Sequence, residues 1–160
     1  MDKKIFRSGG LYDLFYKDKD YNSESNYVDK IIKESNSDSC KILELGCGTG
    51  KHATILTSKG YEIVGVDQSD SMIKNANLKK GFTCQLGDIR SFRIDNKFDA
   101  VISLFHVISY QITNKSLNRV FKTANIHLNK GGIFLFDVWY GPAVFHQKPI
   151  TRIKTINVKD

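Results

Sequence analysis

Residues 41–50 read KILELGCGTG, an apolar run that leads straight into a turn with glycine at every second position. The run is typical of a short buried strand, and Gly46, Gly48 and Gly50 permit positive φ angles and close approach of a ligand to the backbone. A helix is predicted to follow over Lys51–Lys59, and its N-terminus offers free N–H groups. Three glycines between a buried strand and a helix favour a turn that binds a ligand over a tight turn that only connects the strand to the helix.

Strand and helix patterns alternate along the rest of the chain. Strands are predicted at Lys41–Leu45, Tyr61–Val66, Phe82–Leu86, Phe98–Leu104 and Ile133–Val138. Helices are predicted at Asn22–Ser35, Lys51–Lys59, about Asp70 to Lys80, and Ser116–Leu128, with Gly60, Gly81 and the run Lys130-Gly131-Gly132 at three of their ends. Apolar strands that alternate with helices imply a parallel sheet covered on both faces. The right-handed crossover rule then predicts a doubly wound α/β sheet, which binds ligands beyond the carboxyl ends of its strands.

The composition is that of one ordinary globular domain, with 160 residues, 41% hydrophobic and 26% charged. No run of about 18 apolar residues is present, and the first residues are too polar for a signal peptide, so we expect a cytoplasmic protein. The net charge of +7 comes from scattered basic residues, which favours a solvated surface over a nucleic-acid site. Cys40, Cys47 and Cys84 show no metal-ligand spacing, so we expect free thiols, with neither a disulfide nor a metal.

Two features narrow the class of ligand: the spacing of the glycines, and the positions of two acidic residues. Dinucleotide sites use GxGxxG, whereas Lys51 stands at the place of the third glycine, and no GK[ST] pair indicates a phosphate-binding loop. Asp67 follows the second strand, where a carboxylate can accept hydrogen bonds from both ribose hydroxyls of an adenosine; its alternative role is to cap the next helix. Asp88 follows the third strand, where it can accept from the amine of an adenine while the N–H of Ile89 meets a ring nitrogen.

Four blocks in order, KILELGCGTG, VGVDQSDSMI, GDI and FDAVISLFHVISY, resemble the motif series of class I S-adenosylmethionine-dependent methyltransferases. The resemblance implies a Rossmann-like fold and S-adenosyl-L-methionine as cofactor. It places the glycine turn under the methionine and ribose parts, Asp67 on the ribose, and Glu44 on the turn or on the amino group. The cofactor contacts that it implies are Glu44, Gly46, Cys47, Gly48, Gly50, Asp67, Gln68, Met72, Asp88, Ile89, Leu104 and Phe105.

The ends of the chain show a narrower resemblance. LYDLFYKDKDYNSESNYV and FDVWYGPAVF are similar to bacterial small-molecule enzymes of this class, among them N,N-dimethyltransferases of nucleotide-linked amino sugars. In those enzymes a tyrosine-containing N-terminal segment folds over the cofactor, and Tyr12 and Tyr16 match it. The alternative is that these aromatic residues fasten the first helix to the sheet. The resemblance implies a small-molecule acceptor methylated on N or O, and neither a nucleic acid nor a membrane as partner.

A base assists methyl transfer when the acceptor is a hydroxyl or an ammonium. His106 and Tyr110 are the candidates because both follow the fourth strand, and the sugar enzymes often carry a histidine near the position of Tyr110. Trp139 and Tyr140, after the fifth strand, are predicted to line the substrate pocket, with capping of the sheet as the alternative. His52 is expected to be structural, with contact to the methionine part of the cofactor as the alternative, and His127 and His146 are expected to lie on the surface.

The number of strands sets the expected domain organisation. The family fold has seven strands, whereas five are predicted here, with at most one more at Thr151–Val158. We therefore divide the chain into a lid and helix segment (1–38), a cofactor-binding core (39–140) and the start of a substrate or dimerisation extension (141–160). Since the last strands of the family fold are missing, we expect a truncated product or an N-terminal fragment that can form a homodimer through the extension.

Three other functions remain open from the sequence alone. The domain could bind the cofactor without catalysing transfer. It could methylate RNA or protein, although no Asn-Pro-Pro-Tyr type of motif follows the fourth strand. It could be an NAD-dependent oxidoreductase, which the GxGxG spacing disfavours.

Overall fold

The computed structural model describes residues 8–77, 79–147 and 155 of the chain. Within them, a sheet is formed by β1 (Lys41–Leu45), β2 (Glu62–Asp67), β3 (Phe82–Leu86), β4 (Phe98–Ser103) and β5 (Leu128–Phe136). The helices are α1 (Gly9–Phe15), α2 (Tyr21–Ser35), α3 (Lys51–Ser58), α4 (Asp70–Asn77), the 3-10 helix η2 (Val107–Tyr110), α5 (Asn114–His127) and α6 (Gly141–His146). None of these described helices is both long and apolar enough to cross a membrane.

The sheet has the order β3-β2-β1-β4-β5, and its neighbouring strands are all parallel. The chain starts at the central strand β1, moves outward to β3, and then crosses back to β4 on the other side of β1. The prediction of a doubly wound parallel α/β sheet is therefore confirmed. In an open sheet of this kind, ligands bind beyond the carboxyl ends of the strands at the point where the order reverses, which here lies between β1 and β4.

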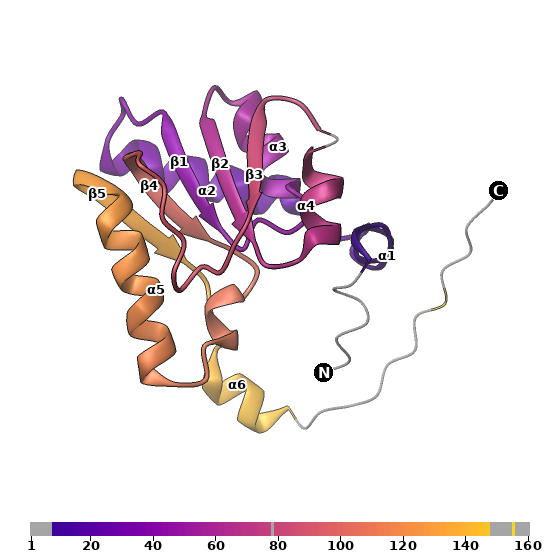
Figure 1. The fold of residues 1–160 in the computed structure, drawn as a ribbon. Helices are drawn as coiled ribbons and strands as arrows, with labels where there is room; N and C mark the ends of the chain where they lie inside the picture. Colours follow the sequence, from indigo (N-terminus) through magenta and orange to yellow (C-terminus); the bar gives the residue numbers. More distant parts are fainter. Residues whose placement is uncertain (1–7, 78, 148–154, 156–160) are drawn as a thin grey trace.

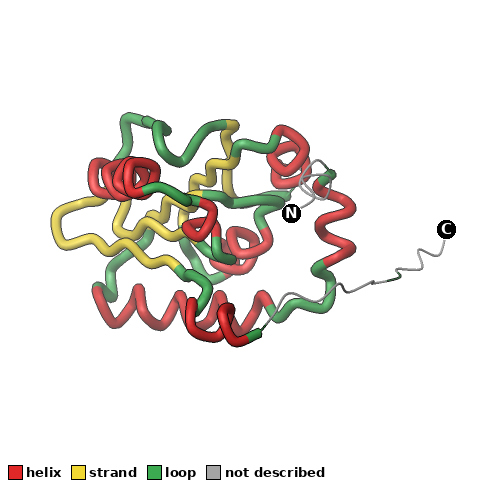
Figure 2. Tube along the Cα trace, turned by 90° about the horizontal axis from the view of Figure 1, so that it is seen from below, coloured by secondary structure: helices red, strands yellow, loops and turns green. Residues whose placement is uncertain are grey.

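Helices cover both faces of the sheet (Figure 1), and Figure 2 shows them on either side of the strands. On one face, α2 and α3 pack against Ile42 and Ile102; on the other, Val120 of α5 packs against Leu43 and Val101. Successive residues of a strand point to opposite faces. The central strands are buried on both sides, which is why they appear in the sequence as continuous apolar runs.

The strands β1 to β4 lie within one residue of their predicted positions, but the start of β5 does not. The prediction that Lys130-Gly131-Gly132 ends the preceding helix is wrong. Helix α5 ends at His127, and β5 begins at once with Leu128, which pairs with Phe98. The register then shifts before Ile133 pairs with Ala100. Gly131, at φ 84°, therefore lies within the strand, at the irregularity where the register shifts.

Three helical segments are not predicted by the sequence patterns, namely α1, η2 and α6. They have seven, four and six residues, which is too short for a clear helical periodicity. Helix α4 ends at Asn77, before the predicted end at Lys80. The predicted strand Thr151–Val158 lies, except for residue 155, outside the described residues.

His127 is buried in the structure, with 2% of its surface exposed, so the prediction that it lies on the surface is wrong. Its Nε2 accepts a hydrogen bond from the amide of Ile94 at 3.1 Å, and its Nδ1 lies 2.7 Å from the carbonyl oxygen of Thr123. The ring also packs beside Phe92 and Phe98. His127 thus joins α5 to the chain segment before β4. His146 is exposed, as predicted.

Replacement of His127 by leucine is expected to lower the free energy of unfolding by about 1–3 kcal/mol, because the partly buried amide of Ile94 loses its acceptor. Leucine keeps an apolar side chain at this position, so the loss reports mainly on the hydrogen bond. Denaturant unfolding measures the change, and His146→Leu on the exposed face of α6 is the matched control. Equal stabilities for the two variants would show that the contact of His127 with Ile94 does not contribute.

Candidate functional site

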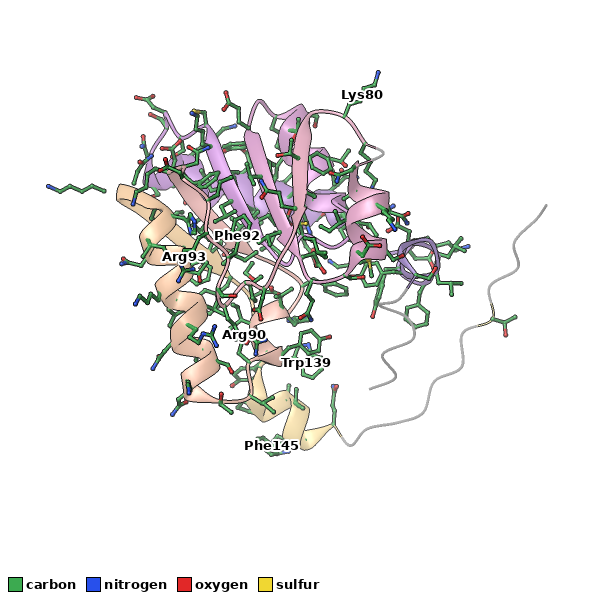
Figure 3. The ribbon with its side chains drawn as sticks, viewed as in Figure 1. Lys80, Arg90, Phe92, Arg93, Trp139 and Phe145 are labelled. Carbon is green, nitrogen blue, oxygen red and sulfur yellow. The ribbon has the colours of Figure 1, made fainter. Side chains whose placement is uncertain are left out.

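An open cavity of about 1440 Å³ lies at the carboxyl edge of the sheet. Its wall is built by the segments that follow β1, β2, β3 and β4, together with α1 and Trp139. Figure 3 shows Arg90 and Trp139 at this end of the sheet, whereas Lys80 lies at the opposite end. The volume exceeds the roughly 300–1,000 Å³ of a site for one small ligand. The cavity therefore has room for two molecules side by side.

The glycine turn after β1 forms part of the cavity wall. Gly46, Gly48 and Gly50 all have positive φ, at 82°, 53° and 71°. A β-carbon at Gly46 would lie 2.7 Å from both methyl carbons of Val107, and one at Gly50 would lie 2.6 Å from the ring of Phe82. A β-carbon at Gly48 would have no described heavy atom within 4 Å. Packing thus requires glycine at two positions, whereas Gly48 leaves open the side of the turn that faces the cavity.

Asp67, at the end of β2, forms a hydrogen bond with the glycine turn. Its Oδ2 accepts from the amide of Gly48 at 3.0 Å, and its Oδ1 accepts from the amide of Ser69 at 2.9 Å. Burial raises the pKa of Asp67 above its ordinary value, against the opposing effect of the backbone N–H donors. Helix α4 begins at Asp70, and the hydroxyl of Ser69 accepts from the amide of Met72. Asp67 is therefore a carboxylate at the cavity wall, and Ser69 caps the helix.

Asp88, after β3, also lines the cavity, but its carboxylate already has a cationic partner. The Nε of Arg90 donates to Oδ1 and Oδ2 at 2.9 and 3.0 Å, and its terminal nitrogen lies 2.5 Å from Oδ2. These hydrogen bonds lower the pKa of Asp88. Each carboxylate oxygen can accept more than one hydrogen bond, so Asp88 keeps some capacity for a ligand beside Arg90.

Helix α1 lies beside α4 (Figure 1), and residues of both helices line the cavity. The hydroxyl of Thr49 in the glycine turn donates to Asp13 of α1 at 2.6 Å, and the amide of Gly9 donates to Ser71 of α4 at 3.0 Å. Tyr12 and Tyr16 both line the cavity, and the ring of Tyr16 meets that of Phe105 edge-on at 5.0 Å. The N-terminal segment is thus fastened to the turn and to α4 while its tyrosines face the cavity.

His52, in the first turn of α3, lies between two carboxylates. Its Nε2 is 2.8 Å from Oε2 of Glu24, and its Nδ1 is 3.7 Å from Oε1 of Glu44. The hydrogen bonds from His52 and Lys19 lower the pKa of Glu24 to about 2. Glu44 is 1% exposed, and its Oε2 has no hydrogen-bond partner among the described residues. His52 lines the cavity whereas Glu44 does not, a placement that is compatible with the alternative in which His52 contacts the methionine part of the cofactor.

Burial raises the pKa of Glu44 well above its ordinary value, and the nearby Cys84 and Asp67 act in the same direction. A carboxyl whose folded-state pKa is raised contributes stability below its unfolded pKa and loses it as the pH rises toward the folded pKa. We therefore expect Glu44→Gln to stabilise the protein at neutral pH, by an amount that grows as the pH rises from about 4.3, the unfolded-state pKa of a glutamate, toward neutral pH. Denaturant unfolding across this range tests it, with the exposed Glu34→Gln as control. A variant less stable than the parent at neutral pH would contradict this expectation.

The segment after β4 holds two consecutive residues in a strained conformation. Phe105 and His106 both have φ 62°, a region that costs a non-glycine residue about 1–3 kcal/mol. Asp137, after β5, holds this turn: its Oδ1 accepts from the amide of His106 at 3.0 Å, and its Oδ2 lies 3.0 Å from Nδ1 of the same residue. Nδ1 is shielded from solvent, while the side chain as a whole is 33% exposed and lines the cavity.

The structure brings most of the predicted site residues to the cavity wall. The predicted residues that line it are Tyr12, Tyr16, Gly46, Cys47, Gly48, Asp67, Gln68, Met72, Asp88, Ile89, Leu104, Phe105, His106, Tyr110 and Trp139. Three predicted residues do not line it. Glu44 is buried behind His52, Gly50 packs against Phe82, and Tyr140 is 73% exposed at the start of α6.

Several residues of the site are missing from the sequence prediction. Arg90 and Asp137 are the partners of Asp88 and His106, and Asp13 fastens α1 to the turn. Thr49 and Lys51 flank the last glycine of the turn, so their positions next to the motif could have indicated them. No local sequence signal identifies Asp13 or Asp137, because their partners lie more than 30 residues away in the chain.

The fold and the site together define a class of protein: a Rossmann-like α/β domain with a ligand cavity at the reversal of its strand order. The profile of the family described as "Methyltransferase domain" matches residues 42–132, which is more than half of the chain, so the chain belongs to that family.

Individual relatives point to enzymes of amino-sugar chemistry. The chain is 30% identical over 138 residues to the dTDP-3-amino-3,4,6-trideoxy-alpha-D-glucopyranose N,N-dimethyltransferase of Streptomyces venezuelae, covering 84% of this chain and 58% of the relative. It is 26% identical to the dTDP-4-amino-2,3,4,6-tetradeoxy-D-glucose N,N-dimethyltransferase of Saccharopolyspora spinosa, with 84% and 55% covered. The crystal structure of the sugar N-methyltransferase KedS8 from a Streptoalloteichus species superposes with a TM-score of 0.78 at 30% identity, with 84% and 56% covered. The chain thus spans little more than half the length of these relatives.

Proposed function

We propose that this protein binds S-adenosyl-L-methionine and transfers its methyl group to a nitrogen or oxygen atom of a small molecule. The observation that carries the proposal is the hydrogen bond from the amide of Gly48 to the carboxylate of Asp67. This hydrogen bond holds the carboxylate after β2 against the glycine turn, and both residues line the cavity. Membership of the methyltransferase-domain family supports the same conclusion.

The residues around the cavity fit the parts of this cofactor. Asp67 is suited to the ribose hydroxyls, since one carboxylate can accept several hydrogen bonds. Met72 and Ile89 offer apolar contact for the adenine, with Asp88 beside them. His52 is suited to the methionine part because the ionised Glu24 adds negative charge behind it, where the amino group of the cofactor is positive. The bound cofactor would supply an electrophilic methyl group; the chain aligns the acceptor with it and excludes water.

We assign proton removal from the acceptor to His106. Nδ1 lies 3.0 Å from Oδ2 of Asp137 and is shielded from solvent, without a hydrogen bond of good geometry between the two atoms, so Nε2 is the ring nitrogen that we assign to take up the proton. Asp137 acts as a positioning residue, since it holds both the backbone amide and the ring of His106. Tyr110 also lines the cavity, but burial and the nearby Tyr16 raise its pKa, which disfavours it as a base.

Nucleotide-linked amino sugars are the proposed acceptor class. Two relatives are named as N,N-dimethyltransferases of dTDP-linked amino sugars, which carry an amine that is protonated in water. Such an amine must lose its proton before it attacks a methyl group, and His106 can accept that proton. The ring of Trp139 lies 5.8 Å from that of His106 and offers a flat apolar wall for a sugar at this position.

Calorimetric titration with S-adenosylhomocysteine tests the cofactor assignment, with NAD as the control ligand. We expect micromolar binding of S-adenosylhomocysteine and no binding of NAD. Binding of NAD alone, or of neither ligand by a protein that circular dichroism shows to be folded, would refute the assignment.

Mass spectrometry of methylated products then tests the acceptor class, with a dTDP-linked amino sugar and S-adenosyl-L-methionine as substrates. We expect His106→Ala to bind S-adenosylhomocysteine normally but to transfer methyl about 10²–10⁴-fold more slowly, while the exposed His146→Ala transfers at the parent rate. If the parent protein methylated only hydroxylated acceptors, the proposed amino-sugar acceptor would be refuted, while the proposed methyltransferase activity would be supported.

A further inference from the structure

Two buried thiols meet behind the glycine turn. The Sγ atoms of Cys47 and Cys84 are 3.4 Å apart, and the thiol of Cys47 donates to that of Cys84. Cys47 belongs to the turn and Cys84 to β3, and they are only 5% and 6% exposed. Both are free thiols, as predicted, and so is Cys40, which is exposed. The two cysteines are 37 positions apart in the sequence, so only the tertiary structure brings their thiols into contact.

The absence of a side chain at Gly65 creates the space in which the two sulfur atoms meet. Gly65 lies in β2, between β1 and β3, and a β-carbon there would lie 2.7 Å from Sγ of Cys47 and 2.8 Å from Sγ of Cys84. Both backbones are held in place. The amide of Cys47 donates to the carbonyl of Val66 at 3.1 Å, and the amide of Cys84 donates to the side chain of Asn77 at 3.1 Å. The fold thus holds the two thiols against each other.

We propose that Cys47 and Cys84 are a modification site: peroxide converts them to a disulfide, and this disulfide lowers the affinity of the adjoining turn for the adenosine cofactor. The second half of the proposal rests on the proposed function, whereas disulfide formation does not. Cys47 lines the cavity, so a small oxidant entering it reaches the pair.

The chemistry needs only hydrogen peroxide as oxidant. One thiol gives up its proton, its thiolate attacks the peroxide, and the O–O bond breaks; the leaving hydroxide takes that proton, so the products are a sulfenic acid and one water molecule. The second thiol likewise gives up its proton and its thiolate attacks the sulfenic sulfur; the S–S bond forms as the S–O bond breaks, and the leaving hydroxide takes the proton to give a second water. Two thiols and one hydrogen peroxide thus give one disulfide and two waters. The hydrogen bond from Cys47 lowers the pKa of Cys84, which favours the thiolate that this step requires.

The position of Cys47 couples the disulfide to ligand binding. The sulfur atoms must approach from 3.4 Å to about 2.0 Å, and Cys47 stands between Gly46, which packs against Val107, and Gly48, whose amide binds Asp67. A shift of Cys47 toward Cys84 therefore strains the bond between Gly48 and Asp67. A bound cofactor covers Cys47 from the cavity side, so it is expected to slow the oxidation.

Peptide mapping of the full chain tests the disulfide. The protein is treated with hydrogen peroxide, unfolded, alkylated and digested; we expect a peptide pair linked through Cys47 and Cys84, while Cys40 is not part of it. Cys40→Ser is expected to form the same linked pair, and Cys84→Ser to form none. A linked pair that includes Cys40, or full alkylation of Cys47 and Cys84 after peroxide has oxidised Cys40, would overturn the proposal.

Titration with S-adenosylhomocysteine tests the consequence. Peroxide is expected to weaken binding by the parent protein by about tenfold or more, dithiothreitol to restore it, and the affinity of Cys84→Ser to be the same before and after peroxide. A parent protein that carries the disulfide and binds as before would overturn the coupling. If the reduced parent protein does not bind S-adenosylhomocysteine, the proposed function fails, and peptide mapping still decides whether the disulfide forms.

Discussion

Gly50→Ala is expected to lower the free energy of unfolding by about 2–5 kcal/mol. Two costs add at this position. Alanine at φ 71° loses about 1–2 kcal/mol in the left-handed region. Its β-carbon would also lie 2.6 Å from the ring of Phe82 and 3.5 Å from Cβ of Ala76, and overpacking of this kind costs about 1–3 kcal/mol. Denaturant unfolding monitored by circular dichroism measures the change.

Gly48→Ala is the matched control two residues earlier in the same turn. Its φ of 53° carries the same conformational cost, but its β-carbon meets no described atom within 4 Å and projects where the cavity is open. We therefore expect a smaller loss of stability, about 1–2 kcal/mol, together with a marked loss of affinity for S-adenosylhomocysteine. If Gly48→Ala were as unstable as Gly50→Ala, or bound the ligand like the parent protein, our distinction between a packing glycine and a ligand-facing glycine would be incorrect.

Asp67→Asn is expected to weaken binding of S-adenosylhomocysteine by about 1–3 kcal/mol, which is roughly five- to 150-fold. Asparagine keeps the size of the side chain but loses the negative charge and half of its capacity to accept hydrogen bonds. The remaining amide oxygen can serve Gly48 or Ser69, the two amides that the carboxylate now binds, or a ribose hydroxyl, but not all of them. Calorimetric titration gives the difference in affinity directly.

The stability of this variant separates a binding role from a structural one. Because burial raises the pKa of Asp67, its charged form is less favourable in the folded protein than in the unfolded chain, and a neutral replacement removes that cost. We therefore expect the free energy of unfolding to stay within about 1 kcal/mol of the parent value. Asp95→Asn, on an exposed aspartate outside the cavity, should change neither quantity. Unchanged affinity in Asp67→Asn would remove Asp67 from the ligand site.

Local patterns in the sequence were sufficient to predict the sheet and one edge of the site. A strand buried on both faces is a continuous apolar run, which is why β1 is predicted to the residue and β4 within one residue. The partly buried β2 is predicted within one residue, and the edge strand β3, in which only Cys84 is buried, is predicted to the residue. Since parallel strands end at the same edge of a sheet, the glycine turn, Asp67, Asp88 and His106 could be placed together before their distances were known. The short helices α1, η2 and α6 escaped prediction because they contain too few residues for a helical period.

The sequence by itself therefore determined the fold class, the edge of the sheet that binds ligands and the glycine turn, since each depends on residues that are adjacent or regularly spaced in the chain. The tertiary structure alone decided which side chains are partners. Arg90 forms an ion pair with Asp88, and Asp137 forms one with His106. His127 is buried against the segment before β4 and accepts a hydrogen bond from it. Likewise, only the fold brings the thiols of Cys47 and Cys84 into contact. Most of these contacts join residues about 30 or more positions apart, and such pairs form only when the packing of the sheet and its helices brings the segments together.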